Sequence, residues 1–173
     1  MTKLLNLCMT PCSIKLYSRF CFFLCVVLCA PSCGKNTLLK YAEEIKVMGF
    51  EEVIVSDVTW KKSKSPYFIP HNILITEDVT LTIEPGVKVY LSPGVLIMCH
   101  GRIEAAGKKD SPIHFKAASS SPWNRIECFG GRYEQSDDPP VNIFHYCVVE
   151  GGGGITLRSS AGEVKGCIFR NNH

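Results

Sequence analysis

The stretch LTIEPGVKVYLSPGVLIMCHGRIEAAG, residues 81–107, decides the fold class because its apolar residues recur at every second position. Alternation with a period of two is typical of β-strands, whose successive side chains point to opposite faces. The turn sequences EPG (84–86), SPG (92–94) and HG (100–101) interrupt this alternation at short intervals. The stretch therefore predicts consecutive short strands that are joined by tight corners.

The same period extends to both sides of this stretch. It predicts a set of inward-facing residues that fill the core: Tyr67, Ile69, Ile73, Ile75, Val79, Leu81, Ile83, Val87, Val89, Leu91, Val95, Ile97, Ile103, Ala105, Ile113 and Phe115. Many short strands with turns at close intervals indicate an all-β sandwich, a barrel or a β-solenoid.

A repeat near the C-terminal end favours the solenoid. FHYCVVEG (144–151) and VKGCIFRN (164–171) align at an offset of 20 residues. The alignment places Phe144 on Val164, Cys147 on Cys167, Val148 on Ile168 and Val149 on Phe169. Such register is what stacked coils need, because each coil buries side chains against the same position of its neighbour.

These motifs resemble the opening of bacterial right-handed parallel β-helix proteins with the pectate-lyase-like fold. The residues that carry the resemblance are Trp60, SPY (65–67), LTIEPGV (81–87), Gly101, AAG (105–107) and PIHF (112–115). SPWNRIECF (121–129) and the two repeat segments resemble the rungs that follow. The resemblance implies an all-β, right-handed parallel β-helix. It implies no single activity, because the fold hosts lyases, hydrolases, adhesins and many proteins of unknown role.

The segment KNTLLKYAEEIKVMGF (35–50) precedes the strands and has apolar residues at helical spacing. We expect a short amphipathic helix there, which would precede the β-helix. The expected organisation is a lipoprotein-type signal peptide over 1–32, a tether with this helix over 33–56, and the β-helix over 57–173. CIFRNNH (167–173) ends on a rung, so we expect a β-helix that is incomplete at its C-terminus.

The first 32 residues predict export. Basic residues precede the apolar run FCFFLCVVLCA (20–30), which has the length of a signal-peptide core. APSCGK (30–35) resembles the lipobox of bacterial lipoproteins, which implies lipidation of Cys33 and attachment to a membrane. The expected location is the cell envelope, at the outer membrane or cell surface. Simple secretion and an uncleaved anchor are the alternatives.

The charge balance gives no reason to expect nucleic acid as a partner. The chain has a formal net charge of +3, but Lys3, Lys15 and Arg19 all lie in the expected signal peptide. The remaining chain has equal numbers of basic and acidic residues, and nucleic-acid binding needs a basic surface.

One loop holds the acidic cluster of the chain. RYEQSDDPP (132–140) contains Tyr133, Glu134, Asp137 and Asp138. Carboxylate oxygens suit Ca²⁺, and a tyrosine ring can stack on a sugar, so these residues are the candidate ligand or calcium contacts. The alternative is a solvated loop that joins two rungs, and we favour it. No other cofactor is expected.

The remaining candidates favour structural roles. Glu104, Glu127 and Glu150 would suit glycoside hydrolysis if they stacked on one face, but the outward half of the strand alternation explains them as well. Cys99, Cys128, Cys147 and Cys167 lack zinc-site spacing, and Cys147 with Cys167 predicts an inward cysteine ladder. EGGGGI (150–155) lacks the lysine of a phosphate loop, and Trp123 fits a core position.

Three functions remain open from the sequence. A non-catalytic surface protein that binds a glycan or a protein leads, because the sequence contains no recognisable catalytic constellation. The alternatives are a polysaccharide lyase or glycoside hydrolase whose active site lies in missing coils, and a purely structural scaffold segment.

Overall fold

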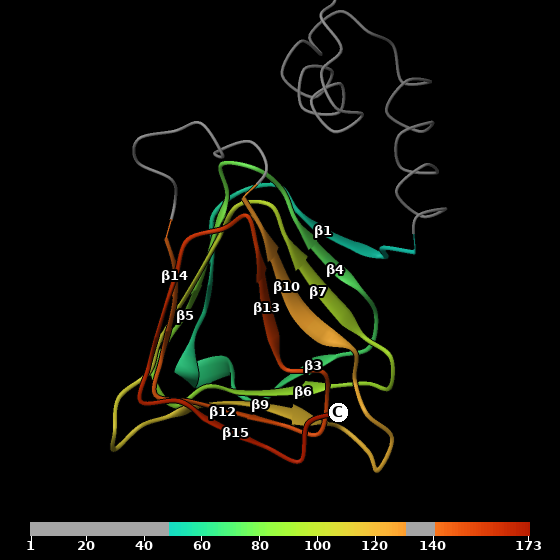
Figure 1. Ribbon diagram of the computed structural model, residues 1–173, viewed down its shortest axis with the longest axis vertical. Helices are drawn as coiled ribbons and strands as arrows, with labels where there is room; N and C mark the ends of the chain where they lie inside the picture. The colour runs from blue at the N-terminus through green and yellow to red at the C-terminus, as the bar shows by residue number, and fades with distance from the viewer. Residues whose placement is uncertain (1–48, 131–140) are drawn as a thin grey trace, which may run out of the picture. The chain divides into compact units, whose positions relative to one another are not determined.

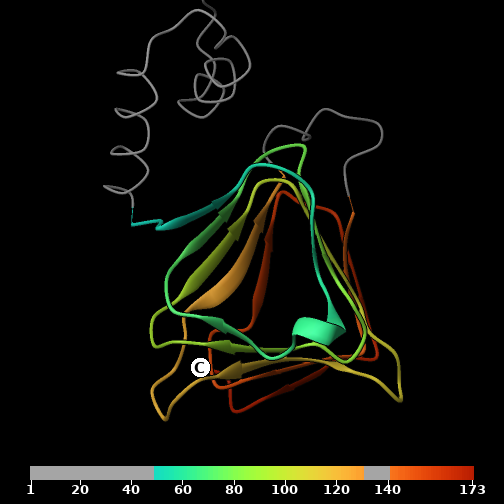
Figure 2. The same ribbon diagram turned by 180° about the vertical axis from the view of Figure 1, so that it is seen from behind.

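The computed structural model describes residues 49–130 and 141–173, which form a stack of parallel strands in three sheets (Figures 1 and 2). Sheet A contains β1 (Glu52–Ile54), β4 (Ile73–Ile75), β7 (Leu96–Cys99), β10 (Arg125–Phe129) and β13 (Ile155–Arg158). Sheet B contains β2 (Val58–Trp60), β5 (Thr80–Ile83), β8 (Arg102–Ala106), β11 (Asn142–His145) and β14 (Gly162–Lys165). Sheet C contains β3 (Tyr67–Ile69), β6 (Lys88–Leu91), β9 (Ile113–Ala117), β12 (Cys147–Glu150) and β15 (Ile168–Arg170).

The chain visits the three sheets in a fixed order, so the strands form successive coils. We number the coils 1 to 5, and coil 1 contains β1, β2 and β3 while coil 5 contains β13, β14 and β15. The view in Figure 1 faces coil 5, and the view in Figure 2 faces coil 1, where the short 3-10 helix Lys62–Lys64 follows β2. This arrangement is a parallel β-helix, and it confirms the all-β, solenoid class.

The core is built from ladders of like side chains that point into the stack. In sheet A, Ile73 faces Ile97 and Ile97 faces Ile126, and all three are buried. In sheet C, Val89 faces Phe115 and Phe115 faces Val149, which are also buried. Burying one such apolar side chain contributes about 1.5–3 kcal/mol, so the ladders supply the main stabilisation between coils.

The inward-facing set expected from the alternation is confirmed. Every member is buried except Tyr67, which is partly buried, packs against the core and stacks on buried Trp60 with ring centroids 5.1 Å apart. Trp123 is buried, as its rung position predicts. The offset of 20 residues is also confirmed, because Phe144 pairs with Val164, and Val149 pairs with Phe169.

The predicted corners turn the chain in two different ways. Gly86 and Gly94 have positive φ angles of 81° and 74°, and each follows a proline. The N–H groups of Val87 and Val95 donate to the carbonyls of Glu84 and Ser92, which closes type II turns. Gly101 instead passes so close to the carbonyl of Val79 that a Cβ atom would lie 2.2 Å from the oxygen.

Asparagine side chains bridge neighbouring coils at the corners. The Asn72 amide donates to the carbonyl of Gly49 at 2.8 Å, and its oxygen accepts from the N–H of Leu96 at 2.8 Å. Asn172 joins coil 5 to coil 4 through both of its bonds, to the carbonyl of Val149 and the N–H of Gly152. These bonds satisfy backbone groups that the sheets leave unpaired where the chain turns.

The expected amphipathic helix and the signal peptide lie outside the described residues. The β-helix itself already includes β1, whose Glu52, Val53 and Ile54 pair with β4. Its first strand thus precedes residue 57, because β1 pairs along its whole length with the buried strand β4. No helix among the described residues has both the length and the apolar character that crossing a membrane would need.

Candidate binding face on sheet C

The outer face of sheet C carries a set of side chains that the coil stacking brings into two rows. Val89, Phe115 and Val149 point into the core, so the residues next to them on each strand point outward. The register places Lys88, His114, Val148 and Ile168 in the first row. It places Phe68, Tyr90, Lys116, Glu150 and Arg170 in the second row.

The second row begins with an aromatic platform. The rings of Phe68 and Tyr90 stack with centroids 5.3 Å apart and an interplanar angle of 16°. Phe68 is 67% exposed, which is unusual for a large apolar side chain on a short strand. An exposed, stacked aromatic pair is a surface on which a flat apolar face of a ligand can rest.

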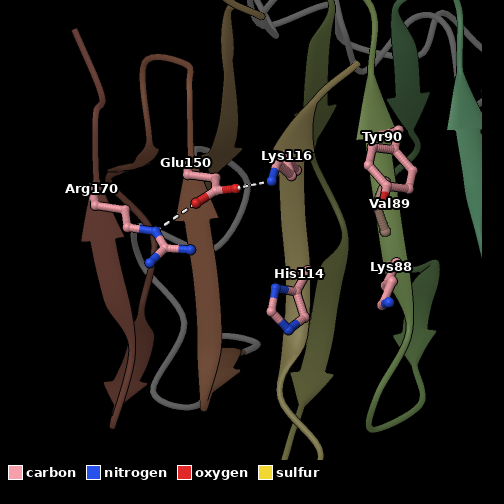
Figure 3. A pocket seen from close by; sticks show the side chains of 7 residues that line it. All are labelled: Lys88, Val89, Tyr90, His114, Lys116, Glu150 and Arg170. Atoms are coloured by element: carbon pink, nitrogen blue, oxygen red, sulfur yellow. Dashed lines mark hydrogen bonds and ion pairs between the residues drawn. The ribbon is translucent and has the colours of Figure 1, made fainter. Parts of the chain in front are cut away.

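The same row continues into a charged triad. Glu150 Oε1 lies 2.7 Å from Lys116 Nζ, and Glu150 Oε2 accepts a hydrogen bond from Arg170 Nε at 2.5 Å (Figure 3). Hydrogen bonds from Lys116 and Arg170 hold the pKa of Glu150 below its ordinary value. The Glu150 side chain is only 11% exposed, whereas those of Lys116 and Arg170 are 52% and 57% exposed.

The first row adds basic character beside this triad. Lys88 is exposed and lies in register with His114 on the next coil. Burial, and then the positive charge of Lys88, lowers the pKa of His114, so the imidazole is neutral at pH 7. The face thus combines three cations with one carboxylate, and it favours ligands that carry negative charge.

Two adjoining hollows lie along these rows. The first has a volume of about 250 Å³ and is lined by Lys88, Val89, Tyr90, His114, Lys116, Glu150 and Arg170 (Figure 3). The second, of about 420 Å³, shares Lys116, Glu150 and Arg170 and adds Ala117, Ser119, Gly151 and Asn171. Because the charged triad belongs to both hollows, they form one groove that crosses successive coils.

Glu150 is poorly suited to general acid or base chemistry. A general acid needs a raised pKa near the working pH, whereas two cations keep this carboxylate ionised. It also lacks a second carboxylate in the groove lining, and glycoside hydrolysis uses a pair. The lowered pKa of Glu150 suits a fixed negative charge that holds Lys116 and Arg170 in place.

The three glutamates considered for hydrolysis do not share a face. Glu104 lies on β8 in sheet B, Glu127 on β10 in sheet A, and Glu150 on β12 in sheet C. The idea that they stack was wrong because the coils differ in length, so similar spacing along the sequence falls on different sheets. All three do belong to the outward half of the alternation.

Glu127 forms a second charged cluster on sheet A. Arg125 Nε lies 3.0 Å from Glu127 Oε2, and Arg158 Nε donates to Oε1. Burial acts to raise the pKa of Glu127, but hydrogen bonds from Arg158 and Arg125 outweigh burial and lower it. This cluster ties coil 4 to coil 5, since Arg158 lies on β13.

The cysteines form two inward ladders, of which the sequence predicts the one that joins Cys147 and Cys167. Cys99 and Cys128 are buried register partners on neighbouring coils. Cys147 is buried beneath half-buried Cys167, whose Sγ lies 3.4 Å from the Cys147 backbone nitrogen. All four are free thiols, and the Cys99 hydrogen bond and burial raise the pKa of Cys128.

In residues 49–130 and 141–173, His, Cys, Asp and Glu side chains form no group that could hold a metal ion.

The candidate site residues named from the sequence include none of the residues of this face. Tyr133, Glu134, Asp137 and Asp138 fall in 131–140, and Cys33 falls in 1–48, so all five lie outside the described residues. Sequence reasoning missed the sheet C face. The sequence feature that could have indicated this face is the set of polar positions that alternate with core residues, as in KVYL (88–91) and IHFKA (113–117).

Comparisons with known proteins find one partial likeness worth reporting. The chain is 29% identical over 101 residues to "Protein bark beetle" of Drosophila melanogaster. The match covers 58% of this chain and spans only 3% of that protein's length. No protein family matches the chain, and no solved structure matches it.

Proposed function

We propose that the chain is an exported β-helix protein whose outer face of sheet C binds an acidic carbohydrate. The protein binds this carbohydrate without catalysing a reaction on it. The observation that carries the proposal is the second row, in which a stacked aromatic pair leads directly into Lys116, Glu150 and Arg170. Neighbouring members of such a row lie about 4.8 Å apart.

The row suits a sugar chain in both of its parts. An aromatic face packs against the apolar C–H face of a pyranose ring, while lysine and arginine donate to carboxylate and hydroxyl oxygens. A sugar unit over Phe68 and Tyr90 would place its neighbour near Lys88 and Lys116, which line the first hollow with Tyr90. Neutral His114 beside them can donate or accept a hydrogen bond.

Calorimetric titration with an oligogalacturonate, and with a neutral glucose oligomer of equal length, tests the proposal. We expect the acidic oligomer to bind more tightly, and its affinity to fall as salt rises. Tyr90→Ala should lower the affinity about ten-fold, which corresponds to about 1.4 kcal/mol. Binding of neither oligomer, or an equal affinity for both, would contradict the proposal.

A matched control is available on sheet A. Phe129 also stacks on a neighbouring ring, that of His100, with centroids 5.2 Å apart. Phe129→Ala removes a stacked aromatic ring from the wrong sheet, so it should leave the affinity unchanged. Release of unsaturated ends during the titration would indicate a lyase, and release of new reducing ends alone would indicate a hydrolase. Either result would contradict a purely binding function.

The leader supports export, and the lipobox resemblance supports a diacylglyceryl anchor on Cys33 at the cell envelope. Mass spectrometry of the mature N-terminus tests this directly, since the lipid adds its mass to a fragment that begins at Cys33. An unmodified N-terminus further along the chain would indicate simple secretion.

Two observations support a right-handed β-helix. They are the course of the chain in Figure 1 and the strong preference of parallel crossover connections for the right hand.

A further inference from the structure

The corner between sheets B and C gathers most of the lysines that the structure describes. It consists of the segments that leave sheet B and enter sheet C, which are residues 61–66 in coil 1, 84–87 in coil 2 and 107–112 in coil 3. In Figure 2 the 3-10 helix Lys62–Lys64 marks this corner in coil 1. The exposed lysines at or directly beside the corner in these coils, which we call the lysine ridge, are Lys61, Lys62, Lys64, Lys88, Lys108 and Lys109.

The turns of coils 1, 2 and 3 stack directly on each other at this corner. A Cβ atom at Gly86 of coil 2 would lie 2.7 Å from Ser111 Oγ of coil 3 and 3.3 Å from Lys62 Nζ of coil 1. In coil 3, the N–H groups of Lys108 and Ser111 each donate to the carbonyl of the other residue, which forms a tight turn with Lys109 inside it. The lysines of three coils therefore share one surface.

The lysine ridge differs from the arginines in its lack of ion pairs. Each described arginine has a carboxylate partner, since Arg102 pairs with Glu104, Arg125 and Arg158 pair with Glu127, and Arg170 pairs with Glu150.

No ion pair among the described residues involves a lysine of the ridge. The carboxylates of the same corner segments are Glu84 and Asp110, and Glu84 Oε2 accepts a hydrogen bond from the N–H of Lys62 at 2.7 Å. Six lysines against two carboxylates leave four positive charges in excess. Because the chain after residue 32 is neutral overall, this excess is local, and it makes the corner attractive to anions.

We infer that the lysine ridge rests on a membrane surface that carries anionic lipid headgroups. Lysine is a compact point charge on a flexible stem, and it lacks the planar fork with which arginine recognises one carboxylate or phosphate in a fixed geometry. A group of lysines without arginine therefore suits a fluid layer of phosphates better than a ligand of fixed shape. The corner of a three-sided coil is also convex, so it can lie along an extended surface but cannot enclose a small anion.

This membrane contact is separate from the carbohydrate face. Lys88 is the one lysine of the ridge that lines either hollow of sheet C. The contact agrees with the proposed anchor at Cys33, because the 34–48 segment spans at most about 50 Å even when fully extended. An anchored chain would therefore keep the ridge close to the bilayer, and the ridge would decide which side of the β-helix faces the lipid.

Co-sedimentation with lipid vesicles tests the inference. The sample is the exported form without residues 1–32 and with Cys33→Ser, so neither the apolar leader nor a lipid contributes, and circular dichroism first verifies that it unfolds cooperatively. We expect binding to phosphatidylcholine vesicles that contain about 30% phosphatidylglycerol, and release from them at about 0.5 M salt. Vesicles of phosphatidylcholine alone should not bind the protein.

Two variants separate the ridge from the net charge. Lys61→Gln combined with Lys109→Gln should lower the affinity for the anionic vesicles at least about ten-fold, because two charges are removed from the contact. Adding Glu51→Gln and Glu52→Gln restores the original net charge at exposed positions on sheet A, away from the ridge. The affinity should stay low in this matched control, and its recovery would overturn the inference.

Equal binding to both kinds of vesicle, or binding to neither, would also overturn the inference. So would lysine variants that keep their vesicle affinity and lose affinity for oligogalacturonate, because the ridge would then belong to the carbohydrate site. The proposed function is tested with a soluble oligomer and this inference with vesicles, so the failure of one is distinguishable from the failure of the other.

Discussion

Two clusters, each of one carboxylate and two cations, lie on different sheets, and they differ in what surrounds them. Glu127 on sheet A and Glu150 on sheet C both belong to coil 4, and each binds a cation of coil 5. The row of Glu127 continues to Met98 and then to buried Leu74. The row of Glu150 continues to Lys116, Tyr90 and exposed Phe68.

Under the proposed function, an ion cluster alone does not make a binding site. Both carboxylates are nearly buried, and both have lowered pKa values through hydrogen bonds with cations. Only the neighbours along the row decide whether the cluster meets an apolar surface or an aromatic and basic groove. We therefore expect removal of Glu127 to change stability, and removal of Glu150 to change binding.

Glu127→Ala is expected to have the largest effect on stability. It removes one charge-assisted hydrogen bond to Arg125 within β10 and one to Arg158 of coil 5, and it leaves a gap between two guanidinium groups. We expect the free energy of unfolding to fall by about 2–3 kcal/mol. Urea unfolding followed by circular dichroism measures it, and a loss below that of Glu150→Ala would break the comparison.

Glu150→Ala should cost less stability, about 1 kcal/mol, because Glu150 is more exposed than Glu127 and its partner Lys116 is more exposed than Arg125. Its effect on binding should have the opposite sign. Without the internal carboxylate, Lys116 and Arg170 are free to bind a ligand carboxylate, so the affinity for oligogalacturonate should rise several-fold. Calorimetry would contradict the account if that affinity fell.

Acid should weaken both clusters together. The folded-state pKa values of Glu127 and Glu150 lie below the unfolded value, which is about 4.3 for glutamate. Their contribution to stability is therefore complete above that pH and is lost as the pH falls through the folded-state values. Unfolding curves between about pH 6 and pH 3 should show this loss, and the double variant Glu127→Gln, Glu150→Gln should show a flatter dependence.

Lys88→Ala is expected to have the smallest effect. Lys88 is exposed and has no ion pair among those described, so stability should change by less than about 0.5 kcal/mol. The affinity for oligogalacturonate should fall about two- to five-fold, and the salt dependence should become shallower. An unchanged salt dependence would remove Lys88 from the binding face.

The fold was predictable because its signals are local. EPG and SPG specify turns through Pro85, Gly86, Pro93 and Gly94, and the alternation of apolar residues specifies which side chains are buried. The offset between Phe144 and Val164 specified the stacking of the last two coils. Each of these signals spans a few residues or repeats at a constant interval.

The binding face was not predictable because it depends on register between coils of unequal length. Val89 faces Phe115, and Phe115 faces Val149, but the intervals between them in the sequence differ. Lys88, His114 and Lys116 therefore look like ordinary solvent-exposed strand positions until the coils are stacked. The same inequality rules out the alternative in which Glu104 and Glu127 stack with Glu150, because they lie on other sheets.

Amide hydrogen exchange, measured with and without oligogalacturonate, tests the central claim most directly. The account predicts slower exchange confined to sheet C, at β6, β9 and β12, where the groove residues lie. Exchange at β7 and β10 of sheet A should not change. Protection on sheets A or B in place of sheet C, or no protection at saturating oligomer, would contradict the claim that the outer face of sheet C is the binding surface.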